Sequence, residues 1–349
     1  MADVLFRHTP YCMRMPAISI LLPVRNAAAT LGETLESLKA QTLTDFQLVL
    51  VDDHSSDASM AVAREIFADD LRLELIVPEA QGLVPALRAG ARACRAPFIA
   101  RMDGDDVAFP RRLELQYRLF EKHPQLAIVG CGVESFADEQ PLGEGYRRYD
   151  QWLNGLLEHD AMMRELYVES PLSHPTVMMR REALEAVGGY QDHLWPEDYD
   201  LWLRMAQRGY QFGKVDEILL RWRDTPGRTS RQDSRYSPEA FMRCKVHYLC
   251  QGPLKEEREV IIWGAGQMGG KFGRLLEEQG KRVVSFVDID PKKIGNRRLH
   301  GWVISPEELP PPRQYKVLAC VGSRGARDLI RTELSARGYA EGTTFWCVL

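Results

Sequence analysis

Short apolar runs alternate with amphipathic segments along the first part of the chain. The apolar runs have the length of buried strands, and apolar residues between them recur at the 3.6-residue spacing of a helix. The expected strands are 17–22, 47–51, 73–77 and 97–102, and the expected helices are 30–41, 59–67, 83–94 and 113–122. Strands that alternate with helices in this way are typical of βαβ units and predict a largely parallel sheet.

The pattern becomes less regular at 134–165 and changes again near 221–237, where Arg, Ser, Asp, Thr and Pro dominate. A helix at 238–249 follows, and an α/β pattern then restarts. Its expected strands are 260–263, 282–287 and 315–321. We therefore expect an α/β protein made of an N-terminal tail (1–16), a first domain (17–223), a helical linker (224–257) and a second domain (258–349).

Composition is consistent with this division. A chain of 349 residues is too long for one compact core, and 45% hydrophobic with 27% charged residues is ordinary for a globular protein. A net charge of -4 gives no reason to expect a nucleic-acid partner, because phosphate binding depends on a basic surface. The seven cysteines are dispersed without a Cys-x-x-Cys pair, which indicates reduced thiols in a cytosolic compartment.

Apolar runs also bear on the expected location. None approaches the roughly 20 residues that a helix needs to span a bilayer. Residues 1–15 include charged residues and lack the apolar core of a secretory signal. We expect a cytoplasmic protein, with contact at the inner face of the membrane left open.

Two carboxylates, Asp52 and Asp53, end the expected strand 47–51. In an open parallel sheet, ligands bind outside the carboxyl ends of the strands, so these side chains are expected at the rim of a pocket. A carboxylate there can accept a hydrogen bond from the imide N–H of uracil. The alternative is a structural one, in which Asp caps the following helix.

Three more carboxylates follow the expected strand 97–102, in an Asp-x-Asp sequence that a third Asp extends: Asp103, Asp105 and Asp106. Mg²⁺ and Mn²⁺ prefer hard oxygen ligands and are often shared between carboxylates and substrate phosphates. The alternative is an acidic surface turn. Three carboxylates within four residues repel one another unless a cation is present, which favours the metal site.

A last acidic pair, Glu197 and Asp198, begins an expected helix. One of these carboxylates can act as a general base that is separate from the metal-binding group. The alternative is favourable charge at the positive end of the helix. His174, which precedes an apolar strand, is equally a structural hydrogen-bonding residue or a residue that lines a site.

A glycine motif, Gly264-x-Gly266-x-x-Gly269, lies between the expected strand 260–263 and a helix, and Asp288 ends the next strand. This context fits a dinucleotide site for NAD(P), with the pyrophosphate on the helix N-terminus and Asp288 on the ribose. The unit of about 90 residues is half of the usual two-part dinucleotide fold. We therefore favour the alternative, in which the glycines serve tight packing.

Residues 17 to about 223 resemble the family 2 glycosyltransferases, the large group with the GT-A fold. The resemblance depends on a series of motifs in the family's order: Ile18–Asn26, Gln41-Thr42, Val51–Asp57, Met102–Asp106, Pro110–Arg112, His174–Val177, Gly188–Tyr190 and Glu197–Arg204. The second domain resembles the small Rossmann-type domains attached to some bacterial sugar-modifying enzymes.

The resemblance implies an inverting, single-displacement transfer of a sugar from a nucleotide-sugar, usually a UDP-sugar, assisted by Mg²⁺ or Mn²⁺. It implies these roles: Pro23, Arg25 and Asn26 beside the base and ribose, Asp53 on uracil, Asp103 on ribose or metal, Asp105 and Asp106 on the metal-bound diphosphate, and Asp198 as the base with Glu197 beside it. In this setting the region 134–165 is expected on the acceptor side.

The chain departs from the family pattern in one place. Many members carry a Tyr-Arg-x-His stretch whose His contacts the diphosphate or the metal, whereas this chain has Trp222-Arg223-Asp224-Thr225. Arg223, Arg228 and Ser230 are the candidates to contact the phosphate instead.

The leading hypothesis is a glycosyltransferase of bacterial surface glycan biosynthesis, acting on a glycan or a lipid-linked acceptor. A second hypothesis makes 258–349 an NAD-dependent oxidoreductase that modifies the sugar, although 270–349 has no Tyr-x-x-x-Lys pair. A third gives that domain a docking role through the aromatic residues Trp302, Phe345 and Trp346, although core packing explains these residues better.

Overall fold

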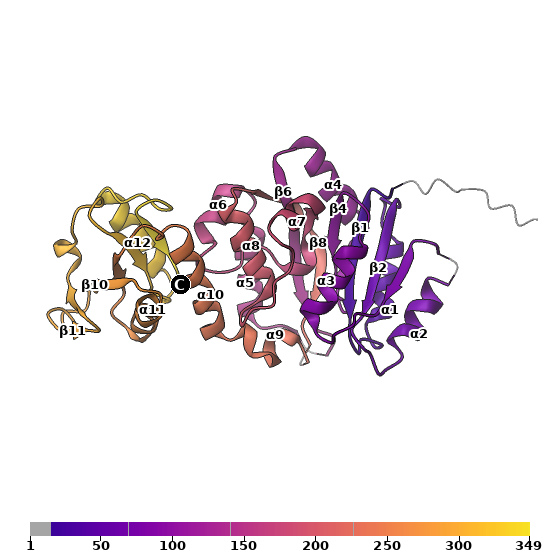
Figure 1. Ribbon diagram of the computed structural model, residues 1–349, viewed down its shortest axis with the longest axis horizontal. Coiled ribbons are helices and arrows are strands. Elements are labelled where there is room, and N and C mark those ends of the chain that lie inside the picture. Colours follow the sequence, from indigo (N-terminus) through magenta and orange to yellow (C-terminus); the bar gives the residue numbers. More distant parts are fainter. Residues whose placement is uncertain (1–14, 69, 140, 226) are drawn as a thin grey trace, which may run out of the picture.

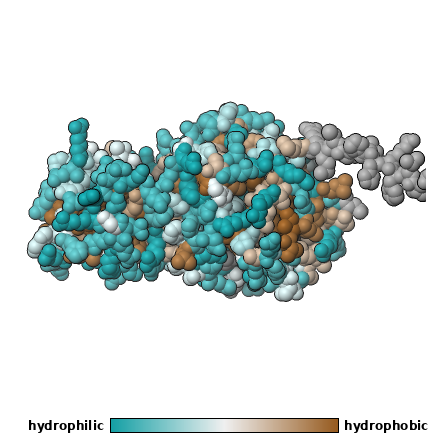
Figure 2. All heavy atoms as spheres, in the orientation of Figure 1, coloured by the Kyte–Doolittle hydropathy of each residue, from teal (hydrophilic) through white to brown (hydrophobic). Residues whose placement is uncertain are grey.

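Two β-sheets follow one another along the long axis of the molecule (Figure 1). The computed structural model describes residues 15–68, 70–139, 141–225 and 227–349, without the side chains of Thr229 and Ser230. Most of the expected N-terminal tail, 1–14, lies outside this part of the chain. On the face shown in Figure 2, hydrophilic atoms predominate, and hydrophobic atoms gather toward the end that holds the first sheet.

The first sheet has the strand order β3-β2-β1-β4-β7-β6-β8-β5 in the described residues. Its strands are β1 (Ile18–Val24), β2 (Phe46–Asp52), β3 (Leu73–Ile76), β4 (Phe98–Arg101), β5 (Val107–Ala108), β6 (Leu126–Phe136), β7 (Met178–Arg180) and β8 (Gln211–Arg223). Strands β1 to β4 pair in parallel, as the sequence predicts.

Beyond β4 the sheet is mixed, so the expectation of a largely parallel sheet is confirmed only in part there: β6 and β8 pair in parallel. Strand β7 pairs antiparallel with both β4 and β6, and β5 pairs antiparallel with β8. The register places Ala100, near the end of β4, beside Met178, the first residue of β7. Strand β7 therefore begins at the edge of the sheet where β4 ends, and it runs in the direction opposite to β4. The short helix η1 (His174–Thr176) precedes β7 at that edge.

The helices around the first sheet are α1 (Leu31–Lys39), α2 (Ser59–Ile66), α3 (Leu83–Ala93), α4 (Arg112–Lys122), α5 (Glu144–Asn154), α6 (His159–Glu165), α7 (Arg181–Ala186) and α8 (Glu197–Gln207). Of these, α1 to α4 match the expected ones to within a few residues and α8 begins where expected, whereas α5, α6 and α7 were not predicted. The region 134–165 is more regular than expected, since it holds the end of β6 as well as α5 and α6. Leu153 is the one fully buried residue of α5, so the sequence shows little helical periodicity there.

The second sheet has the order β11-β12-β10-β9-β13-β14 in the described residues. Its elements are β9 (Glu259–Trp263), α11 (Gln267–Glu278), β10 (Arg282–Val287), β11 (Arg297–Arg298), β12 (Gly301–Ile304), η3 (Pro306–Glu308), β13 (Lys316–Ala319), α12 (Ala326–Ala336) and β14 (Phe345–Cys347). All pairs except β11–β12 are parallel. No helix of the described residues is long and apolar enough to cross a membrane.

The segment between the two sheets is packed on both of them. It holds α9 (Thr229–Gln232), η2 (Ser234–Tyr236) and α10 (Pro238–Gln251), and α10 lies between α8 and α11 (Figure 1). The buried ammonium of Lys245 donates to the carbonyl oxygens of Val168, at 2.6 Å, and Val348, at 3.2 Å. Lys245 of α10 thus joins the first unit to Val348, the residue that follows β14 in the second. The predicted domain boundaries remain a prediction.

Helix α3 approaches the first sheet closely at Gly90. A Cβ there would lie 2.6 Å from Val51 Cγ2 and closer still to Leu21 Cδ1. Both residues are fully buried, so neither can move without disturbing the core. This contact matters for the site because the start of α3, at Gly82 and Leu83, lines the cavity described below.

Gly90→Val is expected to lower the free energy of unfolding by about 2 kcal/mol or more, because the added carbons overpack the contact of α3 with β1 and β2. Urea denaturation followed by circular dichroism measures this. Gly143→Val is the matched control, since a Cβ at Gly143 meets no described atom within 4 Å. Equal losses in the two variants would contradict the prediction.

Candidate functional site

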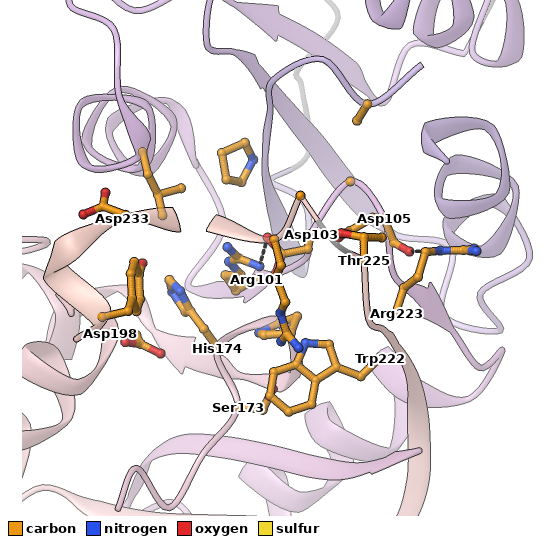
Figure 3. A pocket seen from close by; sticks show the side chains of 18 of the residues that line it. Arg101, Asp103, Asp105, Ser173, His174, Asp198, Trp222, Arg223, Thr225 and Asp233 are labelled. Atoms are coloured by element: carbon orange, nitrogen blue, oxygen red, sulfur yellow. Dashed lines mark hydrogen bonds and ion pairs between the residues drawn. The ribbon is translucent and has the colours of Figure 1, made fainter. Parts of the chain in front are cut away.

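A cavity of about 980 Å³ lies at the carboxyl ends of β1, β2 and β4. Its lining includes nearly all of the residues predicted for nucleotide and base: Pro23, Arg25, Asn26, Asp53, Asp103, Asp105, Glu197 and Asp198. Figure 3 shows Asp105 and Arg223 toward one side of the cavity, Asp198 and Asp233 toward the other, and His174 between them. The structure therefore brings the three acidic motifs, far apart in sequence, to one site.

Asp53 is held in a defined orientation at the end of β2. Its Oδ1 accepts a hydrogen bond from the Gly82 backbone N–H at 2.7 Å, and its Oδ2 lies 3.9 Å from Arg25 Nη1. His54 follows with φ 58°, which turns the chain away from the strand. Asp53 thus joins the end of β2 to the start of α3 and keeps Oδ2 toward the cavity side, beside the half-exposed Arg25.

Asn26 has a structural contact that the sequence did not indicate. Its side-chain oxygen accepts a hydrogen bond from Ser56 N at 2.8 Å, and its own N–H donates to Ser55 Oγ at 3.0 Å. With φ 51°, Asn26 ties the loop after β1 to the loop after β2. The backbone of this loop lines the cavity, whereas the amide side chain is already engaged.

Asp103, Asp105 and Asp106 have carboxylate oxygens within 4.8 Å of one another. Asp106 is 1% exposed and does not line the cavity; its Oδ1 accepts from Arg223 N at 2.8 Å, while Oδ2 has no partner among the described residues. Burial and the charge of Asp103 raise the pKa of Asp105 to about 6 and that of Asp106 well above its ordinary value. Three hard oxygen donors this close together, two of them with raised pKa values, fit a divalent cation.

Arg101, the last residue of β4, is a further charged residue of the cavity that the sequence analysis left without a role. Its buried guanidinium forms an ion pair with Asp103. Burial alone would raise the pKa of Asp103, but Arg101 outweighs that effect and keeps it lowered. A basic residue at the end of an otherwise apolar strand was the available signal.

Arg223 and Arg228 differ in their availability to a ligand. Arg223 is 4% exposed, forms ion pairs with Glu33 and Asp138, and donates from Nε to the Asp105 carbonyl at 2.7 Å. Its charge is thus already compensated. Arg228 stacks 4.1 Å over the Trp222 ring, and its Nη1 lies 3.8 Å from Asp224 Oδ1. It is also a favourable charge for Asp103, Asp105 and Asp106. The Ser230 side chain lies outside the described part of the chain.

Glu197, the first residue of α8, is 2% exposed and partnered on both oxygens. Oε2 accepts from Tyr236 Oη at 2.6 Å, and Oε1 lies 3.7 Å from His174 Nδ1. Burial raises its pKa, but the contacts with His174 and Tyr236 together leave the pKa lowered. His174 in turn is 2.9 Å from Tyr190 Oη, and burial followed by the charge of Arg101 lowers the His174 pKa.

Asp198, the next residue, is half-buried and faces the cavity. Its Oδ1 accepts from Tyr199 N at 2.7 Å. Burial, followed by the adjacent charge of Glu197, raises its pKa to about 7. Asp200, by contrast, is fully buried and bonded to Trp195, Arg204 and Tyr248, so it serves the packing of α8.

One wall of the cavity comes from the segment that the sequence predicted as a linker. It contributes Asp233, Arg235, Tyr236 and Phe241. Nothing in the sequence indicated these residues, because they lie outside the family-like motifs and reach the site only through the packing of α10.

The glycine motif of the second sheet makes mainly internal contacts. A Cβ at Gly269 would overlap the Gly264 carbonyl oxygen, so glycine is needed for the close approach of α11 to the preceding turn. Asp288 Oδ2 accepts from Ala265 N at 3.0 Å and Lys293 Nζ at 2.9 Å. The Gly266 carbonyl accepts from Arg298. These contacts favour packing over dinucleotide binding.

Comparison with known proteins gives consistent matches. The family model "Glycosyl transferase family 2" matches residues 19–188. The chain is 31% identical to the putative glycosyltransferase EpsE of Bacillus subtilis, over 64% of this chain and 78% of the relative. It is 32% identical to the amylovoran biosynthesis glycosyltransferase AmsE of Erwinia amylovora, over 60% of this chain and 76% of the relative.

Among solved structures, TarS of S. aureus in complex with UDP-GlcNAc is similar, with a TM-score of 0.54 and 16% identity. The match covers 75% of this chain and 70% of the other. At this identity the likeness shows the fold alone.

Asp198→Asn is expected to raise the free energy of unfolding at pH 8 by about 1–3 kcal/mol. The pKa of Asp198 is about 7 in the folded protein and about 3.9 in an unfolded chain, so its contribution to stability is full below pH 4 and is lost as pH rises through 7. Asn cannot ionise and still accepts from Tyr199 N.

Urea denaturation of both proteins between pH 4 and 8 measures the effect, and the difference is expected to shrink toward pH 4. Asp216→Asn, at an exposed position of β8, is the control and is expected to change stability little. A difference between wild type and Asp198→Asn that stays constant with pH would contradict the prediction.

Proposed function

The chain belongs to glycosyl transferase family 2 and has the GT-A fold, and on this premise we propose that it transfers a sugar from a UDP-sugar to a hydroxyl acceptor with inversion. The observation that carries the proposal is the arrangement of one cavity, which is lined by Asp103 and Asp105 of the three crowded carboxylates and, on its other side, by Asp198. A metal-bound diphosphate and a general base need separate acidic groups, and the cavity supplies both.

The donor would lie along the ends of β1, β2 and β4. Asp53 Oδ2 would accept from the uracil imide, with Pro23 and Arg25 beside the base and ribose. Asp103, Asp105 and Asp106 would hold Mg²⁺ or Mn²⁺, which neutralises the diphosphate and improves it as a leaving group when bound. Arg223 is engaged by two close carboxylates, whereas the carboxylate contact of Arg228, with Asp224, is long at 3.8 Å, so Arg228 is the side chain that we propose for the phosphate in place of the family's histidine.

The transfer is proposed as one displacement. The acceptor oxygen bonds to the anomeric carbon, the bond from that carbon to the diphosphate oxygen breaks, and UDP leaves. The acceptor proton passes to Asp198. A base is most effective when its pKa lies near the operating pH, and burial next to Glu197 raises the pKa of Asp198 to about 7.

The acceptor is proposed to belong to bacterial surface glycan biosynthesis, either a glycan or a lipid-linked precursor. The name of the relative AmsE, an amylovoran biosynthesis glycosyltransferase, supports a biosynthetic role of this kind. Asp288, the residue predicted for the ribose, is already bonded internally, so the second sheet gives no support to an oxidoreductase as a second function.

Calorimetric titration with UDP and with GDP, each with and without Mn²⁺, tests the donor site. We expect UDP binding that Mn²⁺ strengthens, and a loss of about tenfold or more in Asp53→Ala and in Asp105→Ala, because each removes a direct ligand contact. Asp216→Ala is the control with unchanged affinity. Absence of binding by either nucleotide in the wild-type protein would refute the donor assignment.

Asp198→Asn is expected to reduce sugar transfer by about 100-fold or more, since it removes the base, while UDP affinity stays within about twofold. Transfer is measured by UDP release with acceptors from a screen, and affinity by calorimetry. Glu197→Gln serves as the comparison at the neighbouring carboxylate. Full activity of Asp198→Asn would show that another group takes the proton.

A further inference from the structure

The segment that follows the first sheet both closes the cavity and contacts the start of α8. Tyr236, in η2, donates from Oη to Glu197 Oε2 at 2.6 Å. Twelve residues on, Tyr248 in α10 donates from Oη to Asp200 Oδ1, also at 2.6 Å. Two tyrosines of one segment therefore bind two carboxylates of the same helical turn, on either side of Asp198.

The two adjacent carboxylates of α8 are in different environments. Glu197 is almost fully buried and lies in a connected series of polar side chains that runs from Tyr190 through His174 to Glu197 and Tyr236. Asp198 is half-buried, and its Oδ2 has no hydrogen-bond partner among the residues that the structure describes. An acceptor hydroxyl that enters the cavity can reach Asp198 without displacing another donor.

Tyr236 is itself held in place by local capping and by α10. Asp233 accepts from Arg235 N at 2.9 Å and so caps η2, and Ser237 Oγ accepts from Ala240 N at 3.2 Å at the start of α10. Lys245 then fixes α10 to the carbonyl groups of both units. The cap before Tyr236 and helix α10 after it therefore hold the phenol in a defined place. A residue that orients a neighbouring carboxylate needs such support.

We propose that Tyr236 is a positioning residue of the transfer reaction. Its hydroxyl holds the Glu197 carboxylate in the cavity wall, so that Asp198 presents the free oxygen of the pair to the acceptor. During transfer the acceptor proton goes to Asp198, the new bond joins acceptor oxygen and anomeric carbon, and UDP departs; Tyr236 keeps its proton. This inference rests on the proposed function and adds a residue from outside the family-like motifs.

The test uses Tyr236→Phe in the full chain. The probe is UDP release from UDP-glucose, UDP-galactose and UDP-N-acetylglucosamine, with water as the acceptor, so that no acceptor need be identified. We expect the rate constant to fall about tenfold or more, while the calorimetric UDP affinity stays within about twofold and the melting temperature within about 2 °C. Tyr117→Phe, on α4 away from the cavity lining, is the matched control with unchanged rate.

A double-mutant cycle separates positioning through Glu197 from a general structural role. If Tyr236 acts through this carboxylate, Tyr236→Phe changes the rate less than about twofold in a Glu197→Gln background. Additive losses, or a wild-type rate in Tyr236→Phe alone, would overturn the inference and leave the proposed function intact. If the wild-type protein neither binds UDP nor releases it from these donors, both the proposed function and the inference are refuted.

Discussion

The contacts of Arg223 are the constraint on which the arrangement of the acidic turn depends. Its guanidinium lies at the end of β8 and joins Glu33 of α1 to Asp138 beyond β6, while Nε binds the Asp105 carbonyl and the backbone N–H binds Asp106. These partners lie up to 190 residues away in sequence. By joining them, one buried arginine holds the acidic turn between the parallel strands β1 to β4 and the mixed part of the first sheet.

The same arrangement leaves part of the negative charge of the acidic turn uncompensated. Arg101 compensates Asp103, and Arg223 is neutralised by its own carboxylate partners. The half-buried Asp105 and the buried Asp106 therefore retain raised pKa values. Crowded carboxylates of this kind lower the stability of the unliganded protein. A bound cation or ligand offsets the repulsion between them. Weak internal compensation is thus consistent with a site that binds a metal and a diphosphate.

The start of α8 shows how packing assigns different chemistry to similar residues. Asp200 accepts three hydrogen bonds in the core, and Glu197 contacts Tyr236 and His174. Asp198 retains an oxygen without a hydrogen-bond partner among the described residues, at the cavity. One partner of each of the first two comes from α10 or the turn before it: Tyr248 for Asp200 and Tyr236 for Glu197. Since Lys245 also anchors α10 to the second sheet, the second unit supports the geometry of the site without lining it.

The sequence by itself determined the βαβ order up to β4 and the placement of carboxylates at strand ends, because apolar periodicity and motif spacing are local properties of the chain. It did not reveal the reversal at β7, the regular helix α5, or the cavity wall at 233–241. It also did not show that Asn26 and Asp288 already have internal partners, or that Arg223 is held by two close carboxylates while Arg228 has a single, longer contact with Asp224. Tertiary structure decided these points, since the hydrogen bonds and ion pairs that occupy a polar side chain come from residues distant in sequence, which no local pattern encodes.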